Sequence, residues 1–149
     1  MKQATIDILL IEDNPHEAEL TIRSLRKHQR ISNLKHIDDG AEALEFIFSK
    51  GKYASSQVIQ QPRLILLDLK LPKIDGLEII RQLKSNEKTK CIPIVVLSSS
   101  SVEKDISESY RLGVNSYIVK PVDFASFTKS ISDLGLYWMV LNQSPFSTA

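Results

Sequence analysis

The chain has 149 residues, of which 42% are hydrophobic and 25% are charged, and this length suits one globular domain and leaves no room for a second. With 19 basic and 18 acidic residues and no long basic run, the sequence indicates neither a nucleic-acid partner nor an anionic membrane surface. The single cysteine, Cys91, excludes an intrachain disulfide, and no apolar stretch is long enough to span a bilayer. We therefore expect a cytoplasmic protein with no membrane partner.

The first predicted element is a strand over residues 6–11, which ends in two acids, Glu12 and Asp13. A helix start follows, because Asn14 suits the N-cap and Glu17 stands where a capping-box acid belongs. Further elements are a weak edge strand over 33–37, a helix over 40–49 and a long polar surface loop over 50–62.

Residues 64–76 read LILLDLKLPKIDG and predict the centre of the fold. The apolar run 64–67 suits a strand that is buried on both faces, in the middle of a parallel sheet. It ends at Asp68, so a carboxylate lies where open α/β sheets place their ligands. Turn residues then lead into a helix over 76–84.

The next strand, over 94–97, ends in a run of serines, and Ser100 with Glu103 is expected to form a capping box for a thinly apolar helix. A last strand over 116–119 ends in Lys120 and a proline. Because strands alternate with helices throughout, right-handed crossovers give an α/β fold with a doubly wound parallel sheet.

The final helix shows a heptad-like apolar seam, whose second half runs past the sheet. Gly135 is expected to break or bend this helix, and the first half of the seam is expected to be core. The seam consists of Phe124, Phe127, Ile131, Leu134, Trp138 and Leu141. Apolar surface of this size usually meets a partner, which predicts a homodimer. The expected contact surface is Leu134, Leu136, Tyr137, Trp138 and Leu141.

Four strand ends of the predicted sheet meet at one edge. They deliver Glu12 with Asp13, Asp68, Ser98 and Lys120. Carboxylates held together repel unless a cation joins them, and all-oxygen ligation suits Mg²⁺. Asp68 is then a candidate nucleophile toward a phosphoryl group, with Lys120 as a point charge and Ser98 as a hydroxyl donor for its oxygens.

These motifs make the chain similar to a response-regulator receiver domain of two-component signalling. The matching segments are Ile11-Glu12-Asp13, Leu67-Asp68 with Pro72 and Asp75-Gly76, Leu97-Ser98, and Tyr117-Ile118-Val119-Lys120-Pro121. The resemblance implies a five-stranded, flavodoxin-like sheet in the order 2-1-3-4-5 with an extended C-terminal helix. It also implies a single receiver domain over 1–149, with a core of about 5–134 and an extension over 135–149.

The resemblance also assigns roles to residues. Asp68 is the phosphoacceptor, and Ser98 with Tyr117 forms the switch pair. Mg²⁺ is bound by Asp13, Asp68 and the backbone carbonyl of Lys70, with Glu12 acting through water. Lys120 and Ser98 contact the phosphoryl group, and the Lys120–Pro121 bond is expected to be cis.

By the same resemblance, the chain is a stand-alone response regulator and not an enzyme. A sensor histidine kinase phosphorylates Asp68, and an unknown downstream protein receives the signal. A narrower resemblance, to single-domain regulators that serve cyanobacterial phytochromes, rests on the loop over 50–62 and the tail over 134–138.

Two other functions are consistent with parts of this pattern. A pseudo-receiver scaffold keeps the fold without the chemistry, but such chains usually lack one of the acids or the lysine. A phosphatase of the aspartyl-phosphate type needs a second acid two residues after the nucleophile, and Lys70 stands there. Taken singly, Asp68, Glu12 and Asp13 also suit capping acids, and Tyr117 suits plain core.

Overall fold

The computed structural model describes residues 6–27, 31, 33–56 and 59–146. The predicted domain limit at residue 5 and the last residues of the extension, 147–149, lie outside this part of the chain. Five parallel strands form one sheet in the order β2-β1-β3-β4-β5, as predicted. The strands are β1 (Ile8–Ile11), β2 (Leu34–Ile37), β3 (Leu64–Leu67), β4 (Ile94–Ser98) and β5 (Ser116–Val119).

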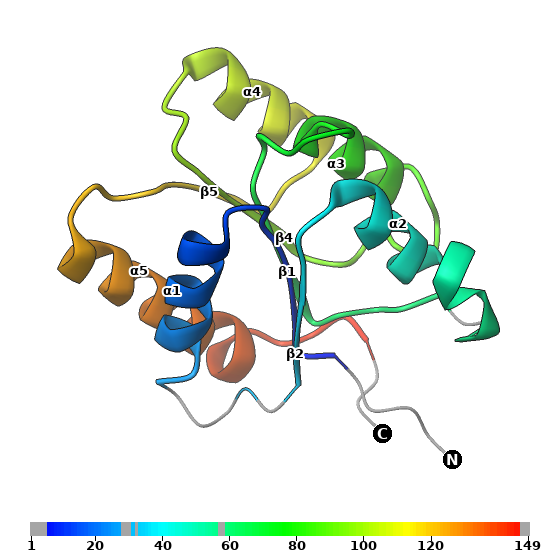
Figure 1. Ribbon diagram of the computed structural model, residues 1–149, viewed down its shortest axis with the longest axis horizontal. Helices are drawn as coiled ribbons and strands as arrows, with labels where there is room; N and C mark the ends of the chain where they lie inside the picture. The colour runs from blue at the N-terminus through cyan, green and yellow to red at the C-terminus, as the bar shows by residue number, and fades with distance from the viewer. Residues whose placement is uncertain (1–5, 28–30, 32, 57–58, 147–149) are drawn as a thin grey trace.

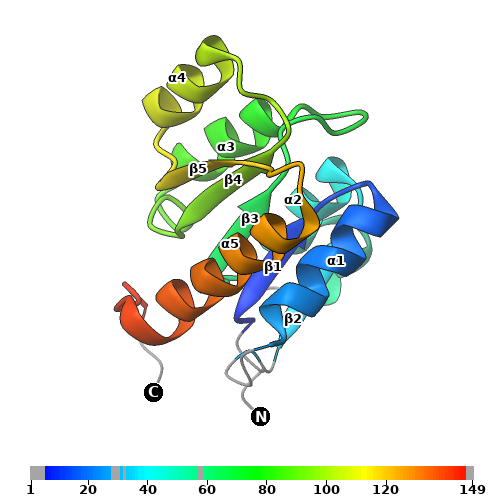
Figure 2. The same cartoon turned by 90° about the vertical axis from the view of Figure 1, so that its left-hand side faces the viewer.

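Helices cover both faces of this sheet. Those on one face are α1 (Pro15–Leu25) and α5 (Phe124–Leu136), and those on the other are α2 (Gly40–Phe48), α3 (Gly76–Lys84) and α4 (Glu103–Leu112). Figure 1 shows α1 and α5 on the left of the sheet, and Figure 2 shows α5 running beside α1. Two apolar clusters follow from this arrangement, because successive strand residues point to opposite faces. None of the helices in the described residues is long and apolar enough to cross a membrane.

The strand register brings the functional edge together. Every residue of β1 and β3 is buried, as the unbroken apolar runs predict for strands with helices on both faces. Ile11 lies beside Leu67, and Leu67 lies beside Val96. The residues that follow β1 and β3, Glu12 and Asp68, therefore leave the sheet at the same level.

Gly76, the first residue of α3, fixes the return of the chain to the site. Its amide donates to the Leu69 carbonyl at 2.9 Å, and the Asp75 carboxylate caps the helix by accepting from the Leu77 amide at 3.1 Å. A Cβ atom at Gly76 would lie 2.6 Å from the Leu69 Cα and 2.8 Å from the Asp68 carbonyl oxygen. A side chain at position 76 therefore collides with the backbone that carries Asp68.

Gly76→Ala is expected to lower the free energy of unfolding by about 3 kcal/mol, because backbone atoms on both sides of the contact must move. Gly135→Ala is the control, since a Cβ there meets only side-chain ends, with Leu25 Cδ2 at 3.2 Å. Its cost should stay below about 1 kcal/mol, because alanine also favours the helix. Urea unfolding of both variants measures the difference, and equal losses would contradict the backbone collision.

Two local expectations are wrong, and a third is incomplete. The predicted surface loop over 50–62 contains a 3₁₀ helix, Gly51–Ser56. The N-cap of α4 is Val102, which makes no side-chain cap hydrogen bond. The Ser100 hydroxyl lies before the helix, where it accepts from the Val102 amide at 3.3 Å and donates to the Asp105 carboxylate at 2.6 Å. Among the described residues no peptide bond is cis, so Lys120–Pro121 takes the trans form that X–Pro bonds prefer.

The C-terminal helix departs from the predicted seam at both ends. Phe124, expected in the core, is 68% exposed. The α-helix runs through Gly135 to Leu136 and continues as a π-helix, Tyr137–Leu141, in which the Asn142 amide donates to the Tyr137 carbonyl at 2.7 Å. This wider turn places Met139 in the core. Leu134, which we predicted on a partner surface, is buried in the core of this protein.

Candidate functional site

Four charged side chains meet at the carboxyl edge of β1, β3 and β5. The Lys120 ammonium lies 2.8 Å from Glu12 Oε1, 3.3 Å from Asp68 Oδ2 and 3.3 Å from Glu17 Oε2. The Lys120 and Glu12 side chains are only 6% and 3% exposed. The three separate strand ends predict this meeting of Glu12, Asp68 and Lys120.

Glu12 is a buried acid with two partners. One carboxylate oxygen accepts from Lys120, and the other accepts from the Asn14 amide at 3.2 Å. Burial raises the pKa of the Glu12 carboxyl to about 7, because the loss of water outweighs the hydrogen bond and the charge of Lys120. The negative charge of Asp68 raises this pKa further.

Lys120 experiences the opposite balance. Burial lowers the pKa of its ammonium, but the hydrogen bond to Glu12 and the charges of Asp68, Glu12 and Glu17 outweigh burial and leave the pKa raised. Lys120 is therefore a fixed positive charge at neutral pH. Three carboxylates surround it, so the site keeps an excess of negative charge.

Glu17 is the member of the cluster that the pattern of strand ends does not predict. We expected it to complete a capping box with Asn14. Asn14 does cap α1, since its side chain accepts from the His16 and Glu17 amides at 3.0 and 3.1 Å. The Asn14 amide, however, donates to Glu12, and the Glu17 carboxylate turns to Lys120. In the sequence, only the place of Glu17 on the first turn of the helix after β1 indicates that it lies near the site.

The donor set of this cluster fits a hard divalent cation. Among the described residues, carboxylate oxygens of Glu12, Glu17 and Asp68 lie within 4.8 Å of one another. Oxygen ligands and excess negative charge are the conditions under which Mg²⁺ binds with a few protein groups. Asp13 is exposed and lies outside this group, so its assignment as a metal ligand stays a prediction.

The backbone beyond Asp68 is held close to its carboxylate. The Lys70 amide donates to Asp68 Oδ1 at 3.3 Å, and the Leu71 amide donates to the Leu69 carbonyl at 3.2 Å. These bonds fix the peptide groups around Lys70. The role of its carbonyl as a metal ligand stays a prediction.

The predicted switch residues are linked through Ser100. Ser98 is fully buried, and its hydroxyl accepts from the Ser100 amide at 3.1 Å. The half-buried Tyr117 donates its hydroxyl proton to the Ser100 carbonyl at 2.9 Å, and its ring packs against the cluster under α2 and α3. A hydrogen-bonded path therefore connects the end of β4 to β5.

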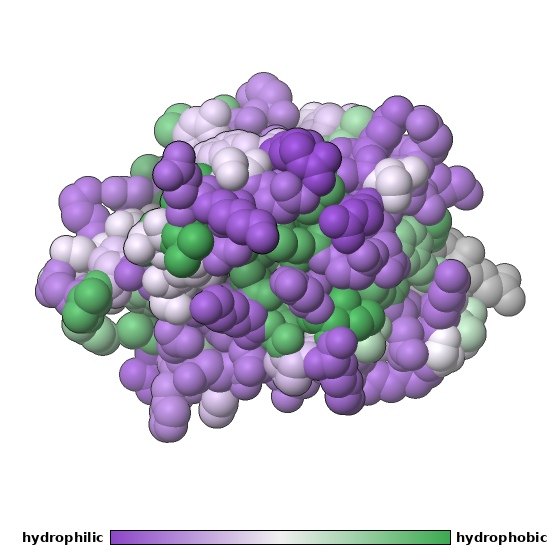
Figure 3. Space-filling model, turned by 90° about the horizontal axis from the view of Figure 1, so that it is seen from above, coloured by the Kyte–Doolittle hydropathy of each residue, from purple (hydrophilic) through white to green (hydrophobic). Residues whose placement is uncertain are grey.

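Figure 3 looks onto the molecule from above the view of Figure 1, toward the end of β1 from which α1 departs. Hydrophilic side chains gather on this face around a smaller apolar area.

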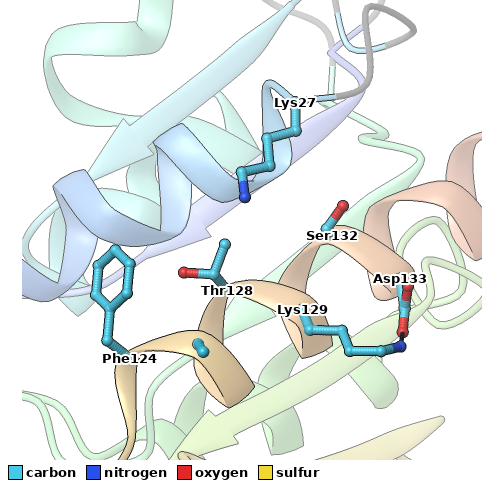
Figure 4. Close-up of a pocket in the computed structure, with 7 residues that line it drawn as sticks. Lys27, Phe124, Thr128, Lys129, Ser132 and Asp133 are labelled. Carbon is cyan, nitrogen blue, oxygen red and sulfur yellow. Dashed lines mark hydrogen bonds and ion pairs between the residues drawn. The ribbon is translucent and has the colours of Figure 1, made fainter.

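A cleft of about 470 Å³ between α1 and α5 lies apart from this cluster. Figure 4 shows Lys27 and Phe124 reaching over it from the two sides, with Thr128 between them and Lys129 paired to Asp133. The Thr128 hydroxyl oxygen is buried and has no hydrogen-bond partner among the described residues.

Thr128→Val is expected to raise the free energy of unfolding by about 1 kcal/mol, because it removes a buried hydroxyl without a partner. Thr89→Val should have the opposite sign, since the Thr89 hydroxyl donates to the Leu83 carbonyl at 2.6 Å. Thermal unfolding of the two variants compares them directly. A loss of stability in Thr128→Val would show that this hydroxyl is satisfied in solution.

Comparison with known proteins gives one consistent result. The model of the response regulator receiver domain matches residues 8–132. Response regulator Rcp1 of Synechocystis is 36% identical over 132 residues, which are 89% of this chain and 88% of that protein. The probable methanogenesis regulatory protein FilR2 of Methanothrix harundinacea is 36% identical over 139 residues, 93% of this chain and 86% of that protein.

Solved structures agree with this result. The phosphorylated cyanobacterial phytochrome response regulator RcpA superposes with a TM-score of 0.88 at 36% identity, covering 96% of this chain and 100% of that one. The Mn²⁺-bound form of Rcp1 gives a TM-score of 0.87 at 34% identity, covering 93% and 98%. The charged edge, the sheet order and these matches together show that the chain belongs to the response regulator receiver domain family.

Proposed function

We propose that this chain is a response regulator of the phytochrome-associated type, which accepts a phosphoryl group on Asp68 from a sensor histidine kinase. The observation that carries the proposal is the Asp68 carboxylate beside the buried Lys120 ammonium, in a cluster with excess negative charge. Support comes from the similarity to RcpA, a cyanobacterial phytochrome response regulator whose structure is that of a phosphorylated protein.

In this reaction an Asp68 oxygen attacks the phosphorus of a phosphohistidine. The new P–O bond forms as the P–N bond breaks, and the imidazole leaves with the bonding electron pair. Lys120 lies within 3.3 Å of Asp68, so its ammonium donates to the transferred oxygens without a large movement. The buried Ser98 hydroxyl at the end of β4 supplies a further donor.

Mg²⁺ is the expected cofactor of this step. Glu12, Asp13, Asp68 and the Lys70 carbonyl are the proposed ligands, with Glu12 acting through water, and Glu17 is a further acid within reach. When bound, the ion neutralises charge on the phosphoryl oxygens and on the carboxylates. Lys120 alone leaves this charge only partly balanced.

Output is proposed to pass through partner binding. A phosphoryl group on Asp68 recruits the Ser98 hydroxyl, and Tyr117 responds through its shared contact with Ser100. This is a shift between two populations that one new charge cluster biases. The downstream protein is unknown.

We also propose a homodimer through the C-terminal helical segment. Leu136, Tyr137 and Leu141 are 37%, 49% and 63% exposed, and Trp138 is half-buried. Light scattering measures the mass directly, and a monomer with and without phosphorylation would refute the dimer.

Intact mass after incubation with acetyl phosphate tests the phosphoacceptor function. With Mg²⁺ we expect one phosphoryl adduct, which peptide mapping assigns to the segment that contains Asp68, and with a chelator we expect none. An adduct elsewhere would refute the proposal. If no adduct forms even with Mg²⁺, the result would favour a scaffold without phosphoryl chemistry. Steady hydrolysis of an added phosphomonoester would favour a phosphatase.

A further inference from the structure

The loop between β3 and α3 contains a strained turn. Lys73 has a φ of 67°, one of two positive φ values at non-glycine residues in the described chain. The Ile74 amide donates to the Pro72 carbonyl at 2.7 Å, which closes a three-residue γ-turn around Lys73. A side chain disfavours this conformation, and such turns are rare. Something outside the turn must hold Lys73 in it.

The side chain of Lys73 makes a contact outside the turn that can stabilise this conformation. Its ammonium lies 2.7 Å from Asp39 Oδ2, in the segment between β2 and α2. Asp39 is also the N-cap of α2, because its other oxygen accepts from the Ala41 and Glu42 amides at 2.8 and 3.1 Å. One oxygen of Asp39 thus fixes the helix and the other fixes the loop. The contact lowers the pKa of Asp39.

Close packing at Gly40 shows that the apex of the loop sits on the start of α2. A Cβ atom at Gly40 would lie 2.8 Å from Ile79 Cδ1 and 3.3 Å from the Ile74 carbonyl oxygen. A side chain at position 40 would crowd the Ile74 carbonyl, so the start of α2 and the loop lie within contact distance of each other. The ion pair therefore joins two segments that are already in contact.

This loop is the one that carries the site. Its base is closed by the bond from the Gly76 amide to the Leu69 carbonyl, and its first peptide group donates to Asp68 through the Lys70 amide. The apex at Lys73 is the second fixed point. With both points fixed, the peptide groups around Lys70 keep one orientation relative to the Asp68 carboxylate.

We propose that Lys73 is a positioning residue, which through Asp39 holds the β3–α3 loop in its strained turn and so sets the Asp68 and Lys70 oxygens for Mg²⁺. This role rests on the proposed function for the identity of the ion. An ordinary surface ion pair is the alternative, since the Lys73 side chain is 68% exposed and such pairs contribute little.

Glycine separates the two explanations, because it adopts a positive φ without help from a side chain. Lys73→Gln removes the charge and keeps the strain, and should weaken Mg²⁺ binding about tenfold, as expected for a group that orients a metal ligand. Lys73→Gly should restore binding to within about threefold of wild type. Lys73→Arg should keep it, because the ion pair survives.

Two further variants test whether the ion pair itself affects Mg²⁺ binding. Asp39→Asn keeps the cap acceptor of α2 but loses the charge, so it should match Lys73→Gln, and the double variant should be no worse than either one. Lys52→Gln is the matched control. Lys52 pairs with Glu42 at 3.1 Å on the same helix and is 62% exposed, and its loss should leave Mg²⁺ binding unchanged.

Titration calorimetry with Mg²⁺ on the unphosphorylated protein gives the affinities, and hydrogen exchange of the Gly76 amide in metal-free protein reports the loop. We expect faster exchange in Lys73→Gln than in Lys73→Gly. Three results would overturn the positioning role. The Mg²⁺ affinity of Lys73→Gln could equal that of the wild type, Lys73→Gly could lose as much affinity as Lys73→Gln, or the wild type could bind no Mg²⁺. Failure of acetyl phosphate to label Asp68 while these affinities behave as expected would count against the proposed function alone.

Discussion

Asp68→Asn is expected to abolish phosphorylation by acetyl phosphate in the presence of Mg²⁺. The amide removes the nucleophilic oxygen and one negative charge of the cluster, while its size and its contact with the Lys70 amide can be retained. Intact mass should show one adduct on the wild type and none on the variant. The loss should be complete, because an amide forms no stable acyl phosphate under these conditions.

Asp75→Asn is the matched control for this substitution. Asp75 lies in the same loop, is exposed, and caps α3 through the Leu77 amide, a role that asparagine fills equally well. It should be labelled like the wild type. A persisting Mg²⁺-dependent adduct on Asp68→Asn would mean that another residue accepts the phosphoryl group, and loss of labelling in both variants would indicate damage to the loop.

The sequence was most informative where burial and chain direction alone decide the structure. The apolar runs of β1 and β3 predicted two central strands, and the acid after each run predicted the site, because parallel strands end at one edge. Both features follow from the course of the backbone and do not depend on side-chain rotamers. Lys120, from a third strand end, joined them for the same reason.

The residues that were missed depend on contacts between distant segments. Glu17 fits a capping position by local rules, and only its place on the first turn of α1 indicates that it lies near Lys120. The sequence does not predict the positive φ of Lys73, because a lysine does not favour this conformation and the Asp39 carboxylate that contacts its side chain lies far away in the chain. The predicted apolar seam of the last helix is wrong beyond Leu136, because a π-helix has more residues per turn than the α-helix before it and places its side chains at different angles.

Lys120→Met is expected to destabilise the metal-free protein by about 3 kcal/mol at about pH 8, because it leaves the buried Glu12 carboxylate without its partner. The loss should depend on pH. The folded-state pKa of Glu12, already about 7 against a usual 4.5, rises further once the hydrogen bond and charge of Lys120 are gone. A carboxyl whose pKa is raised by folding stabilises the protein below its unfolded pKa and loses that contribution as the pH rises through its folded pKa.

The difference between Lys120→Met and wild type should therefore shrink toward about pH 5, where Glu12 is protonated in both proteins. Urea unfolding in the presence of a chelator measures it at each pH. Lys129→Met is the control, since Lys129 pairs with Asp133 at 2.8 Å on the exposed face of α5 and should change stability by less than about 0.5 kcal/mol. A loss that is larger at low pH, or equal in the two variants, would show that Lys120 does not balance the charge of Glu12.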